Sequence, residues 1–112
     1  HLAWVERWWF CDFIGGQSFD YPWSDEDPDA DWRIEADETV ESISQFYADC
    51  VAAANEVIEA AESLDVTGTL SSGERSLRWV LVHMIDETAR HVGQMDIIRE
   101  LVDNTTGYLP GD

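Results

Sequence analysis

The sequence predicts an all-α fold, a bundle of helices, and three observations support this prediction. Apolar residues repeat at intervals of three and four over three segments, which is the spacing of one face of a helix. No segment shows a convincing alternation of apolar and polar residues, the pattern that indicates a strand. Of the 112 residues, 45 % are hydrophobic and 12 % aromatic, so the chain can bury one core. We therefore expect a single domain over residues 1–112.

The first helix is expected over about residues 1–14. Its apolar face carries Leu2, Val5, Trp9 and Phe13, broadened by Trp4 and Trp8. Gly15 and Gly16 follow, and two consecutive glycines favour the end of a helix.

Residues 15–36 form the expected acidic loop, because they contain Pro22, Pro28 and a dense run of carboxylates. The aromatic residues of this loop are Phe19, Tyr21, Trp23 and Trp32. They indicate that parts of the loop pack down against the helices as a lid. The acidic run itself is typical of a solvated surface. A calcium loop of the EF-hand type is excluded, since the required glycine and terminal glutamate are absent.

Two longer helices are expected over about residues 37–63 and 72–102. Asp37 is suited to cap the first of them, and Ser71-Ser72-Gly73-Glu74 matches a capping box at the start of the second. Three amphipathic helices with wide apolar faces require a fourth partner. Because His1 lies inside a predicted helix and is not a methionine, we expect the first helix of a four-helix bundle to be missing from this chain. A second subunit could also supply the fourth partner.

The formal net charge is −18, with 24 acidic side chains against six arginines and no lysine. Such a surface repels phosphate backbones, so we expect no nucleic-acid partner. No apolar run approaches the length of a membrane span and no signal peptide is visible, so a cytoplasmic location is expected. The two cysteines, Cys11 and Cys50, are too few for a disulfide framework and are predicted to be small core residues.

The candidate site is an ionisable pair within the apolar stripe of the last helix. The stripe contains Leu77, Val80, Leu81, Met84, Thr88, Met95, Ile98 and Leu101. Glu87 and His91 lie four residues apart inside it, so both side chains point toward the apolar face. A carboxylate in a core is costly unless it is paired, and the pattern Glu-x-x-x-His supplies two metal ligands. His1, at the start of the aromatic-rich first helix, is the predicted third ligand.

Three protein ligands would leave one coordination position of a divalent metal open, as in catalytic zinc sites. That position could hold water or a thiolate, because a bound metal lowers the pKa of a thiol and makes it a nucleophile at neutral pH. We expect zinc, although imidazole and carboxylate donors also suit nickel and other divalent ions. The alternative is that Glu87 and His91 only form a hydrogen bond within the helix.

Three further side chains on the last helix have both a functional and a structural interpretation. His83 continues the series i, i+4, i+8, but it lies about 12 Å along the axis from the histidine of the pair, so we favour a satisfied histidine at the core edge. Arg90 is the predicted substrate-binding residue, because a guanidinium can hold a carboxylate through two hydrogen bonds. Arg99 could act in the same way. The structural interpretation of both arginines is a surface ion pair, such as Arg99 with Asp96 or Asp103.

Two segments of the chain resemble a known family. The segment from Ser76 to Gln94, SLRWVLVHMIDETARHVGQ, resembles the last core helix of the DinB-like superfamily, and it is closest to the DUF664 branch. The opening HLAWVERWWF resembles the start of that family's second helix, which carries the first metal ligand. The resemblance implies an up-down-down-up four-helix bundle, often dimeric, with a divalent metal held by three side chains. Mycothiol-dependent maleylpyruvate isomerase and related thiol S-transferases use His, Glu and His, which here match His1, Glu87 and His91.

We expect three departures from this family: its first helix is missing from the sequence given, the acidic loop is long, and no counterpart of the isomerase's extra C-terminal domain is expected. Three functions follow as hypotheses. The first is a zinc-dependent S-transferase or isomerase that uses a low-molecular-weight thiol such as mycothiol and an electrophile, and forms a homodimer. The second is a metal-binding or stress-response bundle without catalysis. The third is a structural dimer in which Glu87 and His91 form a buried polar pair.

Overall fold

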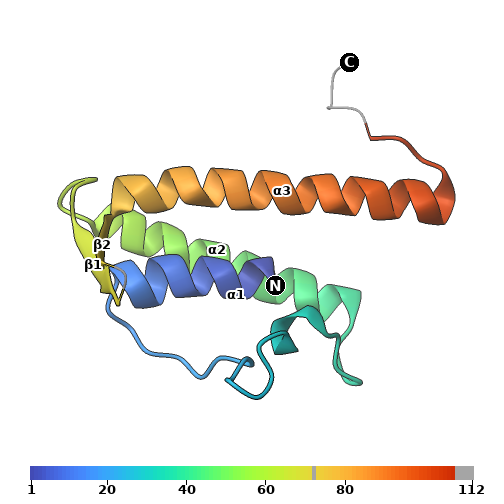
Figure 1. The fold of residues 1–112 in the computed structure, drawn as a ribbon, viewed down its shortest axis with the longest axis horizontal. Coiled ribbons are helices and arrows are strands. Elements are labelled where there is room, and N and C mark those ends of the chain that lie inside the picture. The colour runs from blue at the N-terminus through green and yellow to red at the C-terminus, as the bar shows by residue number, and fades with distance from the viewer. Residues whose placement is uncertain (72, 108–112) are drawn as a thin grey trace. The chain divides into compact units, whose positions relative to one another are not determined.

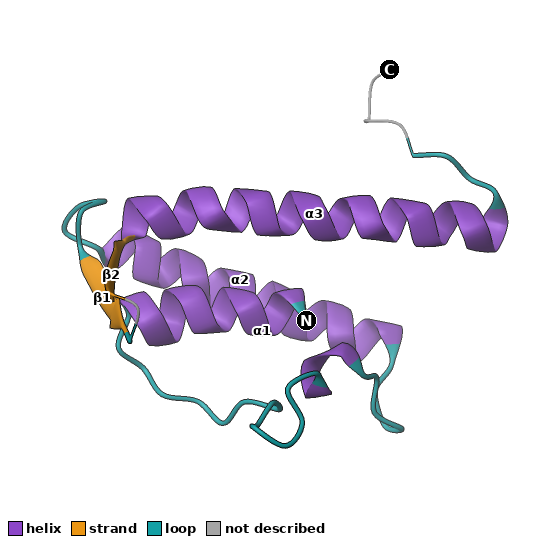
Figure 2. Cartoon of the chain, viewed as in Figure 1, coloured by secondary structure: helices purple, strands orange, loops and turns teal. Residues whose placement is uncertain are grey.

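The structure, a computed structural model, describes residues 1–71 and 73–107. It divides into two compact units, residues 1–80 and residues 81–112. The described chain is mostly helical, with one two-stranded sheet (Figure 2). The predicted helical fold class is confirmed, and the sheet is an addition to it.

The predicted first helix is confirmed, but its winding changes along its length. α1 (Leu2–Glu6) continues without a break into η1 (Arg7–Ile14), which is a π-helix. The N–H of Gly15 donates to the carbonyl oxygen of Phe10, five residues earlier, at 2.9 Å. Gly16 follows with a φ of +69°, a left-handed conformation that glycine adopts without strain. The two glycines therefore end the helix where the sequence predicts.

α2 (Val40–Ala60) fills the expected second helix, but it starts later than predicted. Thr39 Oγ1 accepts a hydrogen bond from the N–H of Ser42 at 3.1 Å, and Ser42 Oγ accepts one from the N–H of Thr39 at 2.9 Å. This reciprocal capping box satisfies two amide groups that the start of a helix would otherwise leave unpaired. The expected cap at Asp37 is therefore wrong, and the helix ends at Ala60 rather than at residue 63.

α1 and α2 run in the same direction (Figure 1). Near the two starts, the ring centroids of Trp4 and Phe46 are 4.8 Å apart. Near the two ends, Gly15 lies beside Val57. Because the two helices are parallel neighbours, residues 15–39 must carry the chain back along their whole length. This return explains the length of the acidic loop. A short 3₁₀ helix, η2 (Ala30–Trp32), interrupts the loop.

The acidic loop packs against the helices through its aromatic side chains, as predicted. The ring of Trp4 meets those of Tyr21 and Trp23 edge-on, with centroids 5.9 and 6.4 Å apart. The guanidinium of Arg7 lies 5.0 Å from the ring centroid of Phe19. Aromatic pairs and cation–ring contacts of this kind contribute about 0.5–2 kcal/mol each. They hold the loop down despite its charge.

A β-hairpin precedes the last helix, so the expectation that the chain has no strand is wrong. β1 (Thr67–Leu70) pairs in antiparallel register with β2 (Gly73–Ser76). The hairpin contacts η1, and Gly68 lies against Phe13. The predicted capping box, Ser71-Ser72-Gly73-Glu74, is also wrong, because Glu74 pairs within the sheet. Its Ser72 lies outside the described residues.

The core of residues 1–80 lies between α1–η1, α2 and the first turn of the last helix. Its buried members are Ala3, Phe10, Cys11, Cys50, Ala54, Leu77 and Val80. Four of these seven residues have small side chains and lie on α1–η1 and α2: Ala3, Cys11, Cys50 and Ala54. The predicted core positions of both cysteines are confirmed, and both thiols are free.

α3 (Leu77–Asp103) begins five residues later than expected and ends close to the predicted position. Met84 and His91 are buried, whereas the later stripe residues Met95, Ile98 and Leu101 are exposed. Only the first half of the predicted apolar stripe is therefore covered. Residues 108–112, the end of the tail that the sequence predicts, lie outside the described residues. None of the helices within 1–71 and 73–107 combines the length and apolar character needed to cross a bilayer.

Candidate metal site

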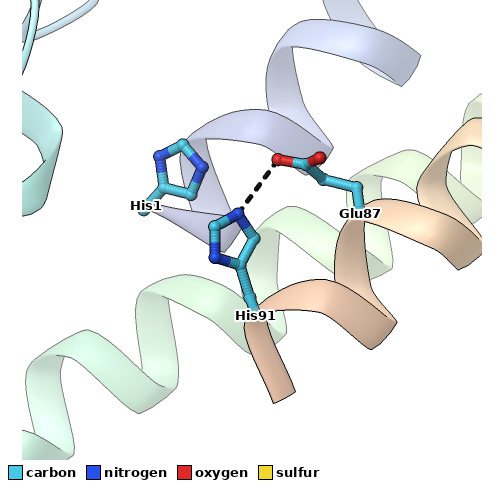
Figure 3. Close-up of side chains that lie close together, drawn as sticks. All are labelled: His1, Glu87 and His91. Carbon is cyan, nitrogen blue, oxygen red and sulfur yellow. Dashed lines mark hydrogen bonds and ion pairs between the residues drawn. The ribbon is translucent and has the colours of Figure 1, made fainter. Parts of the chain in front are cut away.

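Glu87 and His91 point toward one another from successive turns of α3 (Figure 3). His91 Nε2 lies 3.0 Å from Glu87 Oε1, and the side chains are 11 % and 19 % exposed respectively. The predicted i, i+4 pair is therefore formed within one helix. Its position in the covered half of the stripe excludes most of the water that would otherwise screen the carboxylate.

The second ring nitrogen of His91 also faces an oxygen. His91 Nδ1 lies 2.8 Å from Oε1 of Gln94, on the following turn of the same helix. A neutral imidazole has only one N–H, so it can donate to one of these oxygens and not to both. When Nδ1 donates to Gln94, the lone pair of Nε2 faces the lone pairs of the Glu87 carboxylate. A cation between them, either a proton or a metal ion, makes this arrangement favourable.

His1 lies in the other compact unit, at the start of α1, and it is held by the acidic loop. Its Nδ1 is 2.6 Å from Oδ2 of Asp31, whose side chain is only 6 % exposed. The ring of Trp32 stacks on the imidazole, with centroids 3.9 Å apart and planes inclined by 16°. A proton on Nδ1 that is donated to Asp31 leaves the lone pair on Nε2, the nitrogen that could bind a metal.

A pocket of about 300 Å³ opens beside His1 within residues 1–80. Its walls include Trp8, Trp9, Trp23, Trp32, His1 and Asp31. Apolar rings make up most of this lining, and it contains neither arginine nor lysine. The pocket is therefore suited to an apolar or aromatic group.

Neither cysteine has the properties of a nucleophile. Burial raises the pKa of the Cys11 thiol, and this outweighs the opposing charge of Arg7. Burial also raises the pKa of Cys50. Both groups are therefore protonated at neutral pH, and a thiol nucleophile would have to come from another molecule.

The two arginines of α3 that the sequence singles out, Arg90 and Arg99, form surface ion pairs. Arg90 Nη2 lies 3.7 Å from Asp86 Oδ2, and Arg99 Nε lies 3.9 Å from Asp103 Oδ2. All four side chains are more than half exposed, so each pair contributes little to stability. His83 is partly buried on the same helix.

Sequence reasoning missed three residues that hold the predicted ligands: Asp31, Trp32 and Gln94. Gln94 follows His91 by three residues, so helical spacing alone could have indicated the contact. Asp31 and Trp32 are about thirty residues from His1, and no local pattern connects them. Asp31 was also one of many carboxylates in the acidic run.

A carboxylate and an imidazole one helical turn apart place this chain in the class of candidate metal-binding helical proteins. The comparison with protein families is more specific: the model of the family described as Mycothiol-S-transferase matches residues 1–104. The chain therefore belongs to the mycothiol-S-transferase family, and the predicted relationship to DinB-like, mycothiol-related proteins is confirmed. The comparisons with curated proteins and with solved structures give no match.

Proposed function

We propose that this protein is a metal-dependent S-transferase that uses a low-molecular-weight thiol of the mycothiol type. The observation that carries this proposal is the family match, which extends over residues 1–104. The raised pKa values of Cys11 and Cys50 support it, because they leave the nucleophile to an external thiol.

The metal ligands in this proposal are His1, Glu87 and His91. Each offers one ligand atom, so the group consists of two imidazole nitrogens and one carboxylate oxygen. This donor set suits zinc and also nickel, and we propose zinc. The arrangement around His91 supports the assignment, since its Nε2 and the Glu87 carboxylate face each other across 3.0 Å.

A divalent metal at this position would lower the pKa of a thiol, so that it reacts at neutral pH. In the transfer, the thiol sulfur forms a bond to an electrophilic carbon, the leaving group departs with its bonding electrons, and the thiol proton passes to water. The chain's own residues bind and orient the reactants. We propose that the tryptophan-lined pocket receives the apolar part of the electrophile and that Arg90 contacts a substrate carboxylate.

We further propose that the three long helical segments belong to a four-helix bundle with up-down-down-up order. The parallel direction of α1 and α2 supports the two central helices of that order. The exposed side chains of Ile98 and Leu101 support a further helix that covers the end of α3. A second copy of the chain, in a homodimer, would supply this cover, and the mass of the protein in solution tests this.

Metal content of chelator-free protein is the first test. We expect about one zinc ion per chain by elemental analysis, and its loss in His91→Ala. His83→Ala is the matched control, because it removes an imidazole from the same helix outside the proposed ligand group, and it should retain the metal. Folded protein that takes up neither zinc nor nickel would refute the metal site.

The second test is thiol-dependent turnover of the zinc-loaded protein with mycothiol and a fluorogenic alkylating electrophile. We expect turnover that requires both the thiol and the metal and is abolished in His91→Ala. A protein that binds one zinc ion but transfers no thiol to a panel of alkyl and aryl electrophiles would favour the non-catalytic metal-binding bundle instead.

A further inference from the structure

We propose that Asp31 and Trp32 are positioning residues that fix the imidazole of His1 for metal binding. The inference rests on the proposed function, because it assumes that His1 is a ligand. It adds two residues that no sequence motif indicates. Both belong to η2, the short helix within the loop.

Asp31 differs from the other carboxylates of the loop in its surroundings. Its side chain is 6 % exposed, whereas Asp25 and Asp29 are exposed. A buried carboxylate requires a partner, and the 2.6 Å contact with His1 Nδ1 supplies it. A carboxylate that accepts the Nδ1 proton fixes the tautomer of the ring and makes Nε2 a better metal donor.

Trp32 controls the plane of the same ring. The residue as a whole is 53 % exposed, and one face of its ring covers the imidazole of His1. The stack on His1, with planes inclined by 16°, prevents rotation of the imidazole about its Cβ–Cγ bond. One hydrogen bond and one stacked ring together restrict the orientation of the His1 imidazole.

The loop itself holds this pair of residues in place. The N–H of Trp32 donates to the carbonyl oxygen of Asp29 at 3.2 Å, which closes the turn of η2. Arg33 Nη1, on the next residue, donates to Asp27 Oδ1 at 3.0 Å. The turn and the ion pair fix the backbone on both sides of Asp31.

His91 is held in the same manner from a different element. Its Nδ1 contacts Gln94 Oε1 at 2.8 Å, so both histidines of the proposed ligand group have a side-chain oxygen at Nδ1. With the proton on Nδ1, each ring would leave the lone pair of Nε2 for a metal. The shared pattern supports a role in orienting ligands, since a contact that only closed the loop would need no counterpart on α3.

The test is the zinc affinity of the full chain, measured by competition with a chromophoric chelator. Asp31→Ala and Trp32→Ala should each weaken zinc binding by about 10- to 100-fold. Asp25→Asn is the matched control: it removes one charge from an exposed position of the same loop and should leave the affinity within about twofold. Asp31→Asn and Trp32→Phe should retain most of the wild-type zinc affinity, because an amide oxygen still accepts the hydrogen bond from Nδ1 and a phenyl ring still stacks on the imidazole.

A double variant separates ligand positioning from loop packing. Once His1→Ala has removed the ring, Asp31→Ala should cause no further loss of affinity, although it can still lower the melting temperature. The absorption spectrum of bound cobalt gives a second readout and should change in Asp31→Ala but not in Asp25→Asn. Circular dichroism confirms that each variant is folded. Where an alanine variant is not, Asp31→Leu or Trp32→Leu replaces it, because leucine removes the acceptor or the ring but keeps apolar volume.

The outcomes distinguish this inference from the proposed function. If wild-type protein binds zinc and Asp31→Ala binds it equally tightly, the positioning role is refuted and the S-transferase proposal stands. Equal losses from Asp31→Ala with and without His1 would also refute it. If wild-type protein binds no zinc, the proposed function fails and this inference fails with it.

Discussion

Replacing Gly68 by alanine should destabilise the protein, because the hairpin lies too close to η1 to accommodate a side chain. An added Cβ would be 2.2 Å from the carbonyl oxygen of Phe13 and 2.9 Å from two of its ring carbons. The nearest of these atoms belongs to the backbone, so relief requires main-chain movement rather than a change of rotamer. Overpacking of this kind costs about 1–3 kcal/mol.

The expected shift in melting temperature follows from the size of the chain. The entropy of unfolding is about 2.1 cal/mol/K per residue, or about 0.24 kcal/mol/K for 112 residues. A loss of about 2 kcal/mol therefore lowers Tm by about 8 °C. Thermal unfolding followed by circular dichroism at 222 nm, a standard wavelength for helix content, measures this directly.

Gly93→Ala is the matched substitution with the opposite expected sign. Gly93 lies on an exposed part of α3, and an added Cβ would meet nothing within 4 Å. Alanine is more favourable than glycine inside a helix by about 0.5–1 kcal/mol, so Tm should rise by about 2–4 °C. An unchanged Tm for Gly68→Ala would refute the close approach of β1 to η1. A lower Tm for Gly93→Ala would show that this face of α3 is covered in solution.

Three further predictions concern α1–η1, the loop and α2. Burial, together with the hydrogen bond to Asp12, raises the pKa of Tyr21 above that of an unfolded tyrosine, which is about 10. The stability that this shift contributes is therefore complete below about pH 10 and is lost as the pH rises above it. When urea unfolding is measured at pH 8 and at about pH 10.5, the free energy of unfolding should fall less between the two in Tyr21→Phe than in wild type. Iodoacetamide should label Cys11 and Cys50 slowly at pH 7.5 and rapidly in denaturant; rapid labelling of folded protein would contradict their burial. Thr39→Ala should lower the stability by about 1 kcal/mol through loss of the capping box, whereas Asp37→Ala should have almost no effect.

The helices could be predicted because their apolar residues follow a regular spacing. The N-terminal segment and α2 lie within three residues of their expected bounds, and the glycines that end the first helix were identified correctly. The cap of α2 was misplaced because Asp37 and Thr39 are both suitable capping residues. Only the side chain of Ser42, which reaches back to Thr39, decides between them.

The hairpin and the setting of His1 were harder to predict for different reasons. Thr67–Leu70 contains two β-branched threonines and precedes a Ser-Ser-Gly turn, which is a recognisable hairpin pattern. The same serines and Glu74 also match a capping box, so the local sequence was ambiguous. The contacts of His1 with Asp31 and Trp32 depend on the path of a long loop. No periodic pattern in a single sequence determines that path.

The π-helical winding of η1 has a consequence for the length of the N-terminal segment. A π-helix bonds each N–H to the carbonyl five residues earlier, so it accommodates one residue more per hydrogen-bonded ring than an α-helix. Deletion of a single residue within Arg7–Ile14 could be absorbed by tighter α-helical winding, with the hairpin and the glycine stop left in place. An α-helix turns further per residue than a π-helix, so the seven remaining residues would turn the chain through about the same angle as the eight residues of η1. His1 would then keep its direction relative to Asp31, whereas a deletion within an α-helix such as α2 would rotate every residue before it by about 100°.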